Sequence, residues 1–447
     1  MSAFAATAVS RVRSARQNVE IRRLFACVFG MLVLALMTGP SGSNSAPVSG
    51  FTGSLFHPRV LAFLALGVGL WAVITAQHRW GEAIKRTSNN VMTLPRRVMP
   101  DRRVRLFVYA AALAIAIILP LHVNAFWQDV LVDQIGIYVL LAIGLNVVVG
   151  YAGLLDLGYI AFYAIGAYST AYWTGALPVH PPMVVNAFWA IPFAIATAML
   201  AGVLIGAPTL RLRGDYLAIV TLGFGEIIQI VATNLQGVTG GAQGVIGIPH
   251  PSVNLLHIHY SWLIDPLPYY YLLLAFVVLA LIAYSFLEHS RVGRAWTAIR
   301  EDEVAAESTG INVLKYKILA FAIGASTSGF AGMLESSKIS FIEPGDFTVQ
   351  LSILILVLVI FGGMGSLLGA VLGAAVLQWF PWYLREHPLF GFQDQDLFIY
   401  LGAILVIMMI FRPEGMIPSR RRKREIGLAE HGVGTADAMS GSSSEIS

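Results

Sequence analysis

Two carboxylic acids lie within long apolar stretches of the chain, where a charged side chain is costly and is functional by default. Asp156 lies in GYAGLLDLGYIAF, and Glu226 lies in TLGFGEIIQI. Each must pair with a polar group, take up a proton or face water. Glu226 has Gln229 one turn further along as a candidate partner. A contact with a substrate amine, a gating hydrogen bond and a structural tie between helices are all open to it, and Asp156 is a candidate for a transport pathway or for the inner membrane surface.

Glycines interrupt the same apolar stretches. Gly150 and Gly153 favour either close helix packing or a helix break beside a cavity, since unpaired backbone at membrane depth must be covered by protein or water. A second group of five glycines lies in TNLQGVTGGAQGVIGIP, Thr233 to Pro249, and favours a flexible outer loop or backbone groups that face a ligand. We therefore assign to the substrate pathway Asn146, Asp156, Glu226, Thr239, Gly240 and Gly241.

A charged stretch, GRAWTAIREDEVAAESTGI, separates two apolar runs near residues 266–288 and 316–335. At 100° per residue, Val292, Trp296, Ile299 and Ala306 share one helix face, and Glu303 falls within that apolar stripe. The helix therefore breaks near 300–303, or Glu303 makes a polar contact. We expect Gly310 to end the helix. Three consecutive acidic residues would be repelled by an anionic inner leaflet, so a cytoplasmic protein partner fits better than a lipid surface.

Elements that position these residues are predicted to be membrane helices. Only 12% of the residues are charged, about half the share in a soluble domain, and the mean hydropathy is +0.71. The apolar runs are long and continuous, which indicates an all-α, polytopic helical membrane protein. With about 20 residues per crossing, we predict twelve spans, near residues 24–39, 59–77, 106–121, 130–149, 151–173, 183–208, 214–233, 266–288, 316–335, 349–362, 364–380 and 397–411.

The distribution of Lys and Arg supports the even number of spans. With both termini in the cytoplasm and Lys317, at the membrane edge, counted inside, 26 of the 29 Lys and Arg residues fall in inside loops, and the exceptions are Arg59, Lys338 and Arg385. Losing one middle span would move the basic cluster at 420–424 across the membrane. The short first apolar run, after a long basic segment, fits either a cleaved signal peptide or a retained helix, and we favour the retained helix.

Three regions follow from these patterns. Residues 1–105 form an N-terminal extension with two predicted helices and a basic linker, 106–415 form the functional core, and 416–447 form a basic and then disordered tail. Cys27 is the only cysteine, the histidines lack metal-binding spacing, and no phosphate-binding GxxxxGK[ST] motif is present. The net charge of +4 is spread among loops and does not indicate nucleic-acid binding. An ATP-driven process would therefore need an ATPase on another chain.

Several of these motifs, in this order, resemble permeases of branched-chain amino-acid ABC importers, in particular their M-type (LivM-like) subunits. The resemblance covers roughly 106–415 and rests on GLNVVVGYAGLLDLGYIAFYAIGAY, RLRGDYLAIVTLGFGEIIQI, TGGAQGV and SRVGRAWTAIREDEVAAESTGIN. It implies that residues 289–315, called the charged loop below, are the cytoplasmic loop that couples to the ATPase. The ATPase contacts are then assigned to Trp296, Ile299, Arg300, Glu303 and Gly310, although Glu303-Val304-Ala305-Ala306 departs from a strict EAA triplet.

The same resemblance implies partners and a location. The partners are a second, H-type permease, two ABC ATPases that bind ATP and Mg, a periplasmic substrate-binding protein and membrane lipid. This chain would then bind no cofactor, catalyse no reaction and lie in the bacterial inner membrane. Leucine, isoleucine and valine are the expected substrates, with urea, short amides or another small solute as alternatives. An ion-coupled secondary transporter is the rival mechanism, with Asp156 and Glu226 as its proton sites.

Overall fold

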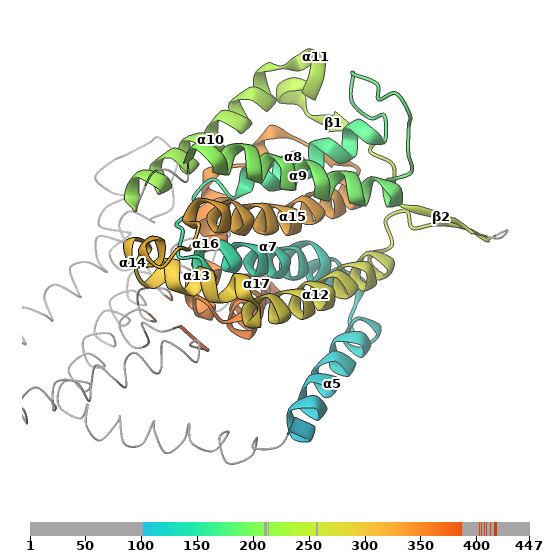
Figure 1. The fold of residues 1–447 in the computed structure, drawn as a ribbon. Helices are drawn as coiled ribbons and strands as arrows, with labels where there is room; N and C mark the ends of the chain where they lie inside the picture. The colour runs from blue at the N-terminus through green and yellow to red at the C-terminus, as the bar shows by residue number, and fades with distance from the viewer. Residues whose placement is uncertain are drawn as a thin grey trace, which may run out of the picture. The chain divides into compact units, whose positions relative to one another are not determined.

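The protein is described here by a computed structural model covering residues 102–209, 212, 214–255, 258–386, 402, 404, 406, 408, 412 and 415–417 (Figure 1). The chain divides into two compact units, one with residues 1–115 and 383–398 and a larger one with 116–382 and 399–447. The arrangement below concerns the larger unit. The spans predicted at 24–39, 59–77 and most of 397–411 lie outside the described residues, so the total of twelve stays a prediction.

Helices make up nearly all of the described chain. The α-helices are α5 (Arg102–Ile118), α6 (Ala125–Asp129), α7 (Ile137–Leu145), α8 (Ile160–Trp173), α9 (Ala187–Thr209), α10 (Asp215–Asn234), α11 (Gln236–Thr239), α12 (Pro266–His289), α13 (Arg291–Glu301), α14 (Glu303–Ser308), α15 (Val313–Ile339), α16 (Val349–Gly362) and α17 (Leu367–Glu386). The π-helices η2 (Val130–Gly136) and η3 (Asn146–Tyr151) flank α7, and short 3-10 turns are η1 (Leu119–Leu121), η4 (Gly241–Gln243) and η5 (Pro344–Asp346).

Six helical runs in the described part of the chain are long and apolar enough to cross a membrane. They are Ala125–Tyr151, Ala187–Thr209, Tyr216–Asn234, Pro266–His289, Val313–Ile339 and Pro344–Gly362. The prediction of a helical protein with several membrane-spanning helices is therefore confirmed for the described residues. The span predicted at 151–173 is wrong at its start, because the chain is not helical between η3 and α8, where Gly153 has a φ of +71°.

Two small antiparallel sheets complete the fold. β1 (Val245–Ile246) pairs with β4 (Phe341–Ile342), and β2 (Ser252–Leu255) forms a hairpin with β3 (Ile258–Ser261). Figure 1 shows the β2–β3 hairpin and α11 at the end of the helical bundle opposite α13 and α14. The charged loop and the glycine-rich segment that contains α11, Thr233 to Pro249, therefore lie at opposite ends of the helical bundle.

Helix α15 is the central element of the bundle and packs closely against α8 and α9 (Figure 1). Its Gly329 lies against the backbone of Ala194 on α9, and its Gly332 lies against the carbonyl oxygen of Tyr163 on α8. Small residues let helix backbones approach closely in lipid, where hydrophobic burial supplies no drive for association. This contact fixes three helices as one body.

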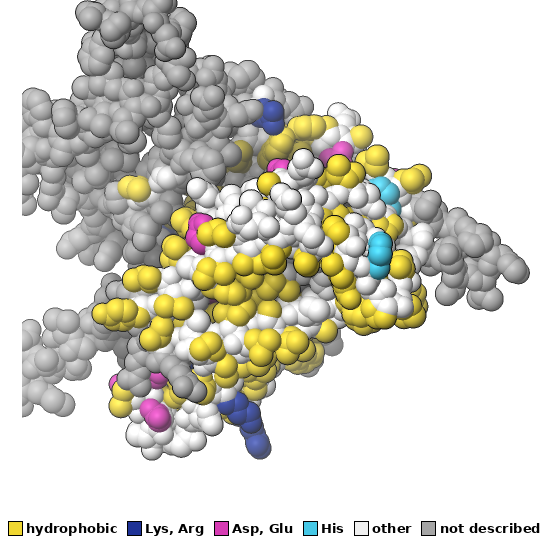
Figure 2. Space-filling view, turned by 90° about the horizontal axis from the view of Figure 1, so that it is seen from above, with side chains coloured by type: hydrophobic (Ala, Val, Ile, Leu, Met, Phe, Trp, Pro, Cys, Tyr) yellow, Lys and Arg dark blue, Asp and Glu magenta, His cyan; other side chains and the backbone are white. Residues whose placement is uncertain are grey.

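One face of the molecule is broadly hydrophobic (Figure 2). The exposed apolar side chains of α9 and α10 include Met199, Leu200, Val203, Leu204, Ile219, Ile227 and Ile230. Only about a fifth of the apolar window of either helix is buried, compared with 72% for α15. This difference is expected if α9 and α10 face lipid or another apolar partner while α15 is enclosed by the protein.

We predict that Gly332→Ala lowers the thermal stability of the purified protein in detergent. The added methyl group would collide with the Tyr163 carbonyl oxygen, and overpacking of this kind costs about 1–3 kcal/mol. Gly223→Ala on α10 is the matched control, because nothing lies within 4 Å of its added methyl group. Equal unfolding temperatures for the two variants would contradict the close packing of α15 on α8.

Candidate functional site

The first feature of the site is a broken helix. The helical run from Ala125 ends in η3 at Tyr151, and α8 begins only at Ile160. The amide groups of Ala152 and Leu154 still donate to the carbonyls of Val147 and Val148, at 3.2 and 3.1 Å. The chain then leaves the helix at Gly153, where a positive φ favours glycine.

Asp156 lies within this break and is 1% exposed. Its Oδ1 accepts a hydrogen bond from the Gly158 amide at 2.9 Å, and the neighbouring Leu157 amide donates to Thr221 Oγ1 on α10 at 3.1 Å. Oδ2 is buried without a hydrogen-bond partner among the residues that the structure describes. Asp156 therefore stabilises the turn that leads into α8, and its second oxygen leaves capacity for one more donor.

A second glycine turn lies beside the first. It joins α16 to α17, and Gly363 and Gly365 have φ values of +116° and +79°. The Gly365 amide donates to Oδ1 of the fully buried Asn146 at 2.9 Å. The predicted pathway residue Asn146 thus joins the two turns, and its Nδ2 has no partner in the described part of the chain.

The charged loop forms two short helices, and α13 contacts η3, where the helical run from Ala125 ends. Ser290 caps α13 by accepting from the Val292 amide at 3.1 Å. Asp302 breaks the helix, with φ −155° and ψ 111°, and caps α14 by accepting from the amides of Val304 and Ala305 at 2.9 and 3.0 Å. Asp302 leaves the helix because its carboxylate satisfies amides that would otherwise be unpaired.

The apolar stripe of the charged loop faces the chain itself. Trp296 is 1% exposed, its Nε1 donates to the Tyr316 carbonyl at 2.7 Å, and Ile299 is also buried. Neither side chain is available to a partner protein in this arrangement. Amphipathic spacing identified the buried face correctly, but it could not show that the buried face belongs to an intramolecular contact.

The other predicted coupling residues have distinct places. Glu303 forms an ion pair with the buried Lys317 at 2.9 Å, and the Arg300 guanidinium donates to the Gly150 carbonyl. Gly310 is exposed and has a φ of +86°, and the Ile311 amide that follows it donates to the Ala306 carbonyl at 3.1 Å. This is the left-handed geometry that glycine supplies after a helix.

Glu226 lies on α10, next to the broken helix. Gly225 packs against the turn, since a methyl group added there would lie 3.4 Å from the Gly158 Cα. The Glu226 side chain is half-buried, and the described residues offer it no hydrogen-bond or ion-pair partner, Gln229 included. Gly225 therefore places α10 against the turn that holds Asp156, whereas Glu226 forms no hydrogen bond or ion pair that ties it to another helix among the described residues.

Thr239, Gly240 and Gly241 lie at the opposite end of the bundle. Thr239 Oγ1 contacts the carbonyls of Ala232 and Leu235, at 2.6 and 2.8 Å, and so closes the end of α10. Gly240 and Gly241 follow with φ values of +81° and +67°. The predicted pathway residues do not gather in one site, because this group and the Asn146–Asp156 group lie at different ends.

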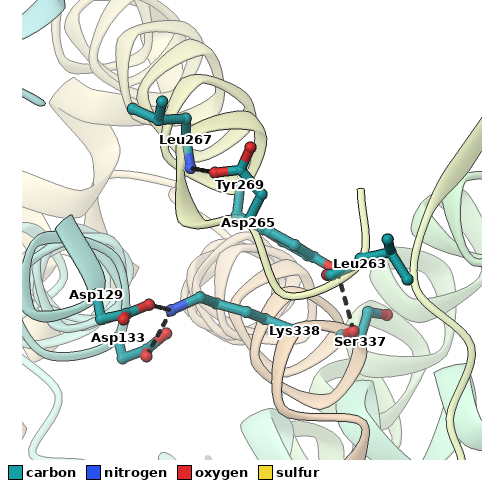
Figure 3. Close-up of polar contacts among 8 residues, drawn as sticks. All are labelled: Asp129, Asp133, Leu263, Asp265, Leu267, Tyr269, Ser337 and Lys338. Atoms are coloured by element: carbon teal, nitrogen blue, oxygen red, sulfur yellow. Dashed lines mark hydrogen bonds and ion pairs between the residues drawn. The ribbon is translucent and has the colours of Figure 1, made fainter. Parts of the chain in front are cut away.

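Sequence reasoning missed a charge cluster around a buried lysine of α15 (Figure 3). Lys338, in the last turn of α15, is 5% exposed and forms ion pairs with Asp129 at 2.9 Å and Asp133 at 2.6 Å. One residue earlier, the Ser337 carbonyl accepts from the Tyr269 hydroxyl on α12 at 3.2 Å. The sequence did contain a signal for this cluster. Lys338 is a lysine that falls outside the cytoplasmic loops, and Asp129 and Asp133 are four residues apart and so share one helix face.

Residues 129–409 match the family described as branched-chain amino acid transport system / permease component. The chain belongs to this permease family. It is 37% identical over 359 residues to the high-affinity branched-chain amino acid transport system permease protein LivM of Salmonella typhimurium, covering 76% of this chain and 81% of that protein.

Two further relatives carry the same family description. The LivM protein of Escherichia coli is 38% identical over 330 residues, which cover 70% of this chain and 74% of that protein. A probable LivM of Methanocaldococcus jannaschii is 25% identical over 328 residues, covering 64% and 91%. No solved structure gave a significant match. The resemblance seen in the motifs is confirmed, and this permease is a multi-pass membrane transport subunit rather than an enzyme.

We predict that Lys338→Met destabilises this permease by about 3–5 kcal/mol, because it leaves two carboxylates facing each other without a cation. Asp133→Asn should cost less, and Asp129→Asn least, since the Asp129 side chain is about half exposed and water can replace its partner. Thermal unfolding in detergent gives the order. A milder effect for Lys338→Met than for Asp129→Asn would rule out a structural role for the cluster.

Proposed function

We propose that this permease is one transmembrane subunit of an ATP-driven importer of branched-chain amino acids. It works with a second, H-type permease subunit, two ATPase subunits that bind ATP and Mg, and a periplasmic substrate-binding protein. The complex lies in the bacterial inner membrane, with both termini of this chain in the cytoplasm. Membership of the family is the observation that carries this proposal, and the charged loop supplies its physical basis.

The charged loop supports a contact with the ATPase. Both of its helices are capped, and three contacts hold it on the membrane helices: Trp296 to Tyr316, Glu303 to Lys317 and Arg300 to Gly150. A loop that is fixed on one side can transmit force, whereas a flexible one would absorb it. The chain contains no phosphate-binding motif of its own, so the force must come from another subunit.

The outer surface of α14 is the proposed docking surface. Val304 is 61% exposed, and Glu301, Asp302 and Glu307, within three residues of it in the sequence, are exposed as well. An apolar knob with an acidic rim fits an apolar hollow with basic margins. We therefore assign the ATPase contact to Val304 and its acidic neighbours, while Trp296 and Ile299 hold the loop on this chain.

Leucine, isoleucine and valine are the proposed substrates. The support is the name shared by the LivM relatives, each described as part of a branched-chain amino acid transport system. Urea, short amides or another small solute are the alternative cargo for the same architecture. The proposed pathway runs along the bundle from Thr239–Gly241 at one end to Asn146 and Asp156 at the other, with Glu226 beside it.

We predict that Val304→Asp abolishes co-purification of the ATPase from detergent-solubilised native membranes. An added carboxylate would disrupt the apolar contact, while an acid in the first turn of α14 leaves that helix stable. Val238→Asp is the matched control, because it changes an exposed valine at the opposite end of the bundle. Full recovery of the ATPase with Val304→Asp would show that the contact lies elsewhere on this chain. If no ATPase co-purifies with the wild-type protein, the result would argue against an ATP-driven importer.

We also predict that Glu226→Ala lowers leucine uptake by about tenfold or more while the complex still assembles, because a half-buried carboxylate without an internal partner is available to a solute amine. Ile230→Ala, at an exposed apolar position on the same helix, should leave uptake unchanged. Radiolabelled uptake in whole cells measures both. Wild-type uptake by Glu226→Ala would assign this carboxylate a structural role.

A further inference from the structure

Arg300 is exposed to solvent on part of its surface, and its guanidinium group also contacts this chain. It lies in the last turn of α13, and its Nη1 donates to the carbonyl of Gly150 in the final turn of η3. The last carbonyls of a helix have no partner within that helix and carry partial negative charge. A guanidinium group therefore satisfies this carbonyl and is attracted to the helix end.

The rest of the Arg300 side chain lies between the two glycine turns. A methyl group added to Gly153 would lie 2.7 Å from the Arg300 Cγ, and one added to Gly365 would lie 3.1 Å from its Nη1. The aliphatic part thus contacts the first turn, and the guanidinium contacts both. A side chain at Gly153 would therefore displace the Arg300 stem, and one at Gly365 would crowd its guanidinium group.

The two turns are also joined directly. Asn146 Oδ1 accepts from the Gly365 amide at 2.9 Å, and Gly150 lies against the same amide. A force applied to Arg300 therefore acts on the broken helix between η3 and α8 and on the α16–α17 turn together. On its other side, the charged loop is held to α15 by Glu303–Lys317 and Trp296–Tyr316.

We infer that Arg300 is a positioning residue that links the charged loop to both glycine turns, so that movement of α13 opens or closes the two turns in concert. This inference rests on the proposed coupling to an ATPase and replaces the direct ATPase contact predicted for Arg300 from the sequence. Arginine suits the role because its planar group presents five donors, whereas lysine presents a single compact charge.

The test uses the complete importer, purified with its ATPase and binding protein and reconstituted in vesicles. Leucine uptake and ATP hydrolysis are measured on the same preparation for wild type, Arg300→Gln and Arg300→Lys. We expect Arg300→Gln to keep the bound ATPase and its hydrolysis rate while the ratio of leucine transported to ATP hydrolysed falls about tenfold, as for loss of a typical coupling free energy. Arg300→Lys should restore part of that ratio.

Gly153→Ala provides an independent variant, since its methyl group would lie 2.7 Å from the Arg300 Cγ and leaves the charge of Arg300 unchanged, although the φ of +71° means that alanine also strains the first turn. It should lower the same ratio, and combining it with Arg300→Gln should add little further loss. Arg291→Gln, an exposed arginine in the first turn of α13, is the control and should keep the wild-type ratio.

Three outcomes would overturn the inference. A wild-type ratio for Arg300→Gln means that Arg300 does not link the turns. Loss of the bound ATPase from Arg300→Gln, but not from Gly153→Ala, would restore the direct contact. Equal losses of thermal stability, hydrolysis and uptake in both variants would assign Arg300 a purely structural role. An absence of ATP-dependent uptake in the wild type would instead contradict the proposed function itself.

Discussion

A helix that breaks inside a membrane protein must still satisfy the backbone groups that the break releases, because the hydrocarbon supplies no water to bind them. In this permease, side chains supply the partners, one from the break itself and two from other elements. Asp156 binds the Gly158 amide, Thr221 binds the Leu157 amide, and Arg300 binds the Gly150 carbonyl. The break is therefore possible only while the charged loop and α10 stay in place.

This dependence joins the local geometry to transport. The partners of the broken helix come from separate parts of the chain, so a shift of the charged loop changes their hydrogen bonds to the break. Helix α15, in contrast, is packed backbone to backbone against α8 and α9 and carries no such freedom. The molecule thus combines a rigid central body with two glycine turns, and movement of these turns is the conformational change that the inferred role of Arg300 requires.

Much of the architecture was predictable from hydropathy and glycine placement. The apolar runs located the six long helices that the structure describes, and the glycines at 150 and 153 lie where the helical run ends. The start of α14 can also be read from the sequence, because Asp302, a residue type that caps helices, precedes the alanine- and glutamate-containing run that forms this helix. These features depend on neighbours in the sequence, which is why they could be recognised.

Contacts between distant segments were beyond such reasoning. The apolar stripe of Trp296 and Ile299 indicated a buried face but could not identify what buries it. The ion pairs of Lys338 join residues more than 200 positions apart, and Arg300 meets Gly150 across 150 positions. Sequence spacing contains no information about such pairings, so it could not show that Trp296, Ile299, Arg300 and Glu303 contact other parts of this chain.

The measurement that tests the central claim most directly is leucine uptake by vesicles that contain the complete, purified importer, with ATP sealed inside and binding protein outside. We predict uptake that requires ATP, persists without a proton gradient, and is inhibited by isoleucine and valine but not by urea. Uptake that continues without ATP and collapses with the proton gradient would contradict the account and would make Asp156 and Glu226 the sites of ion coupling.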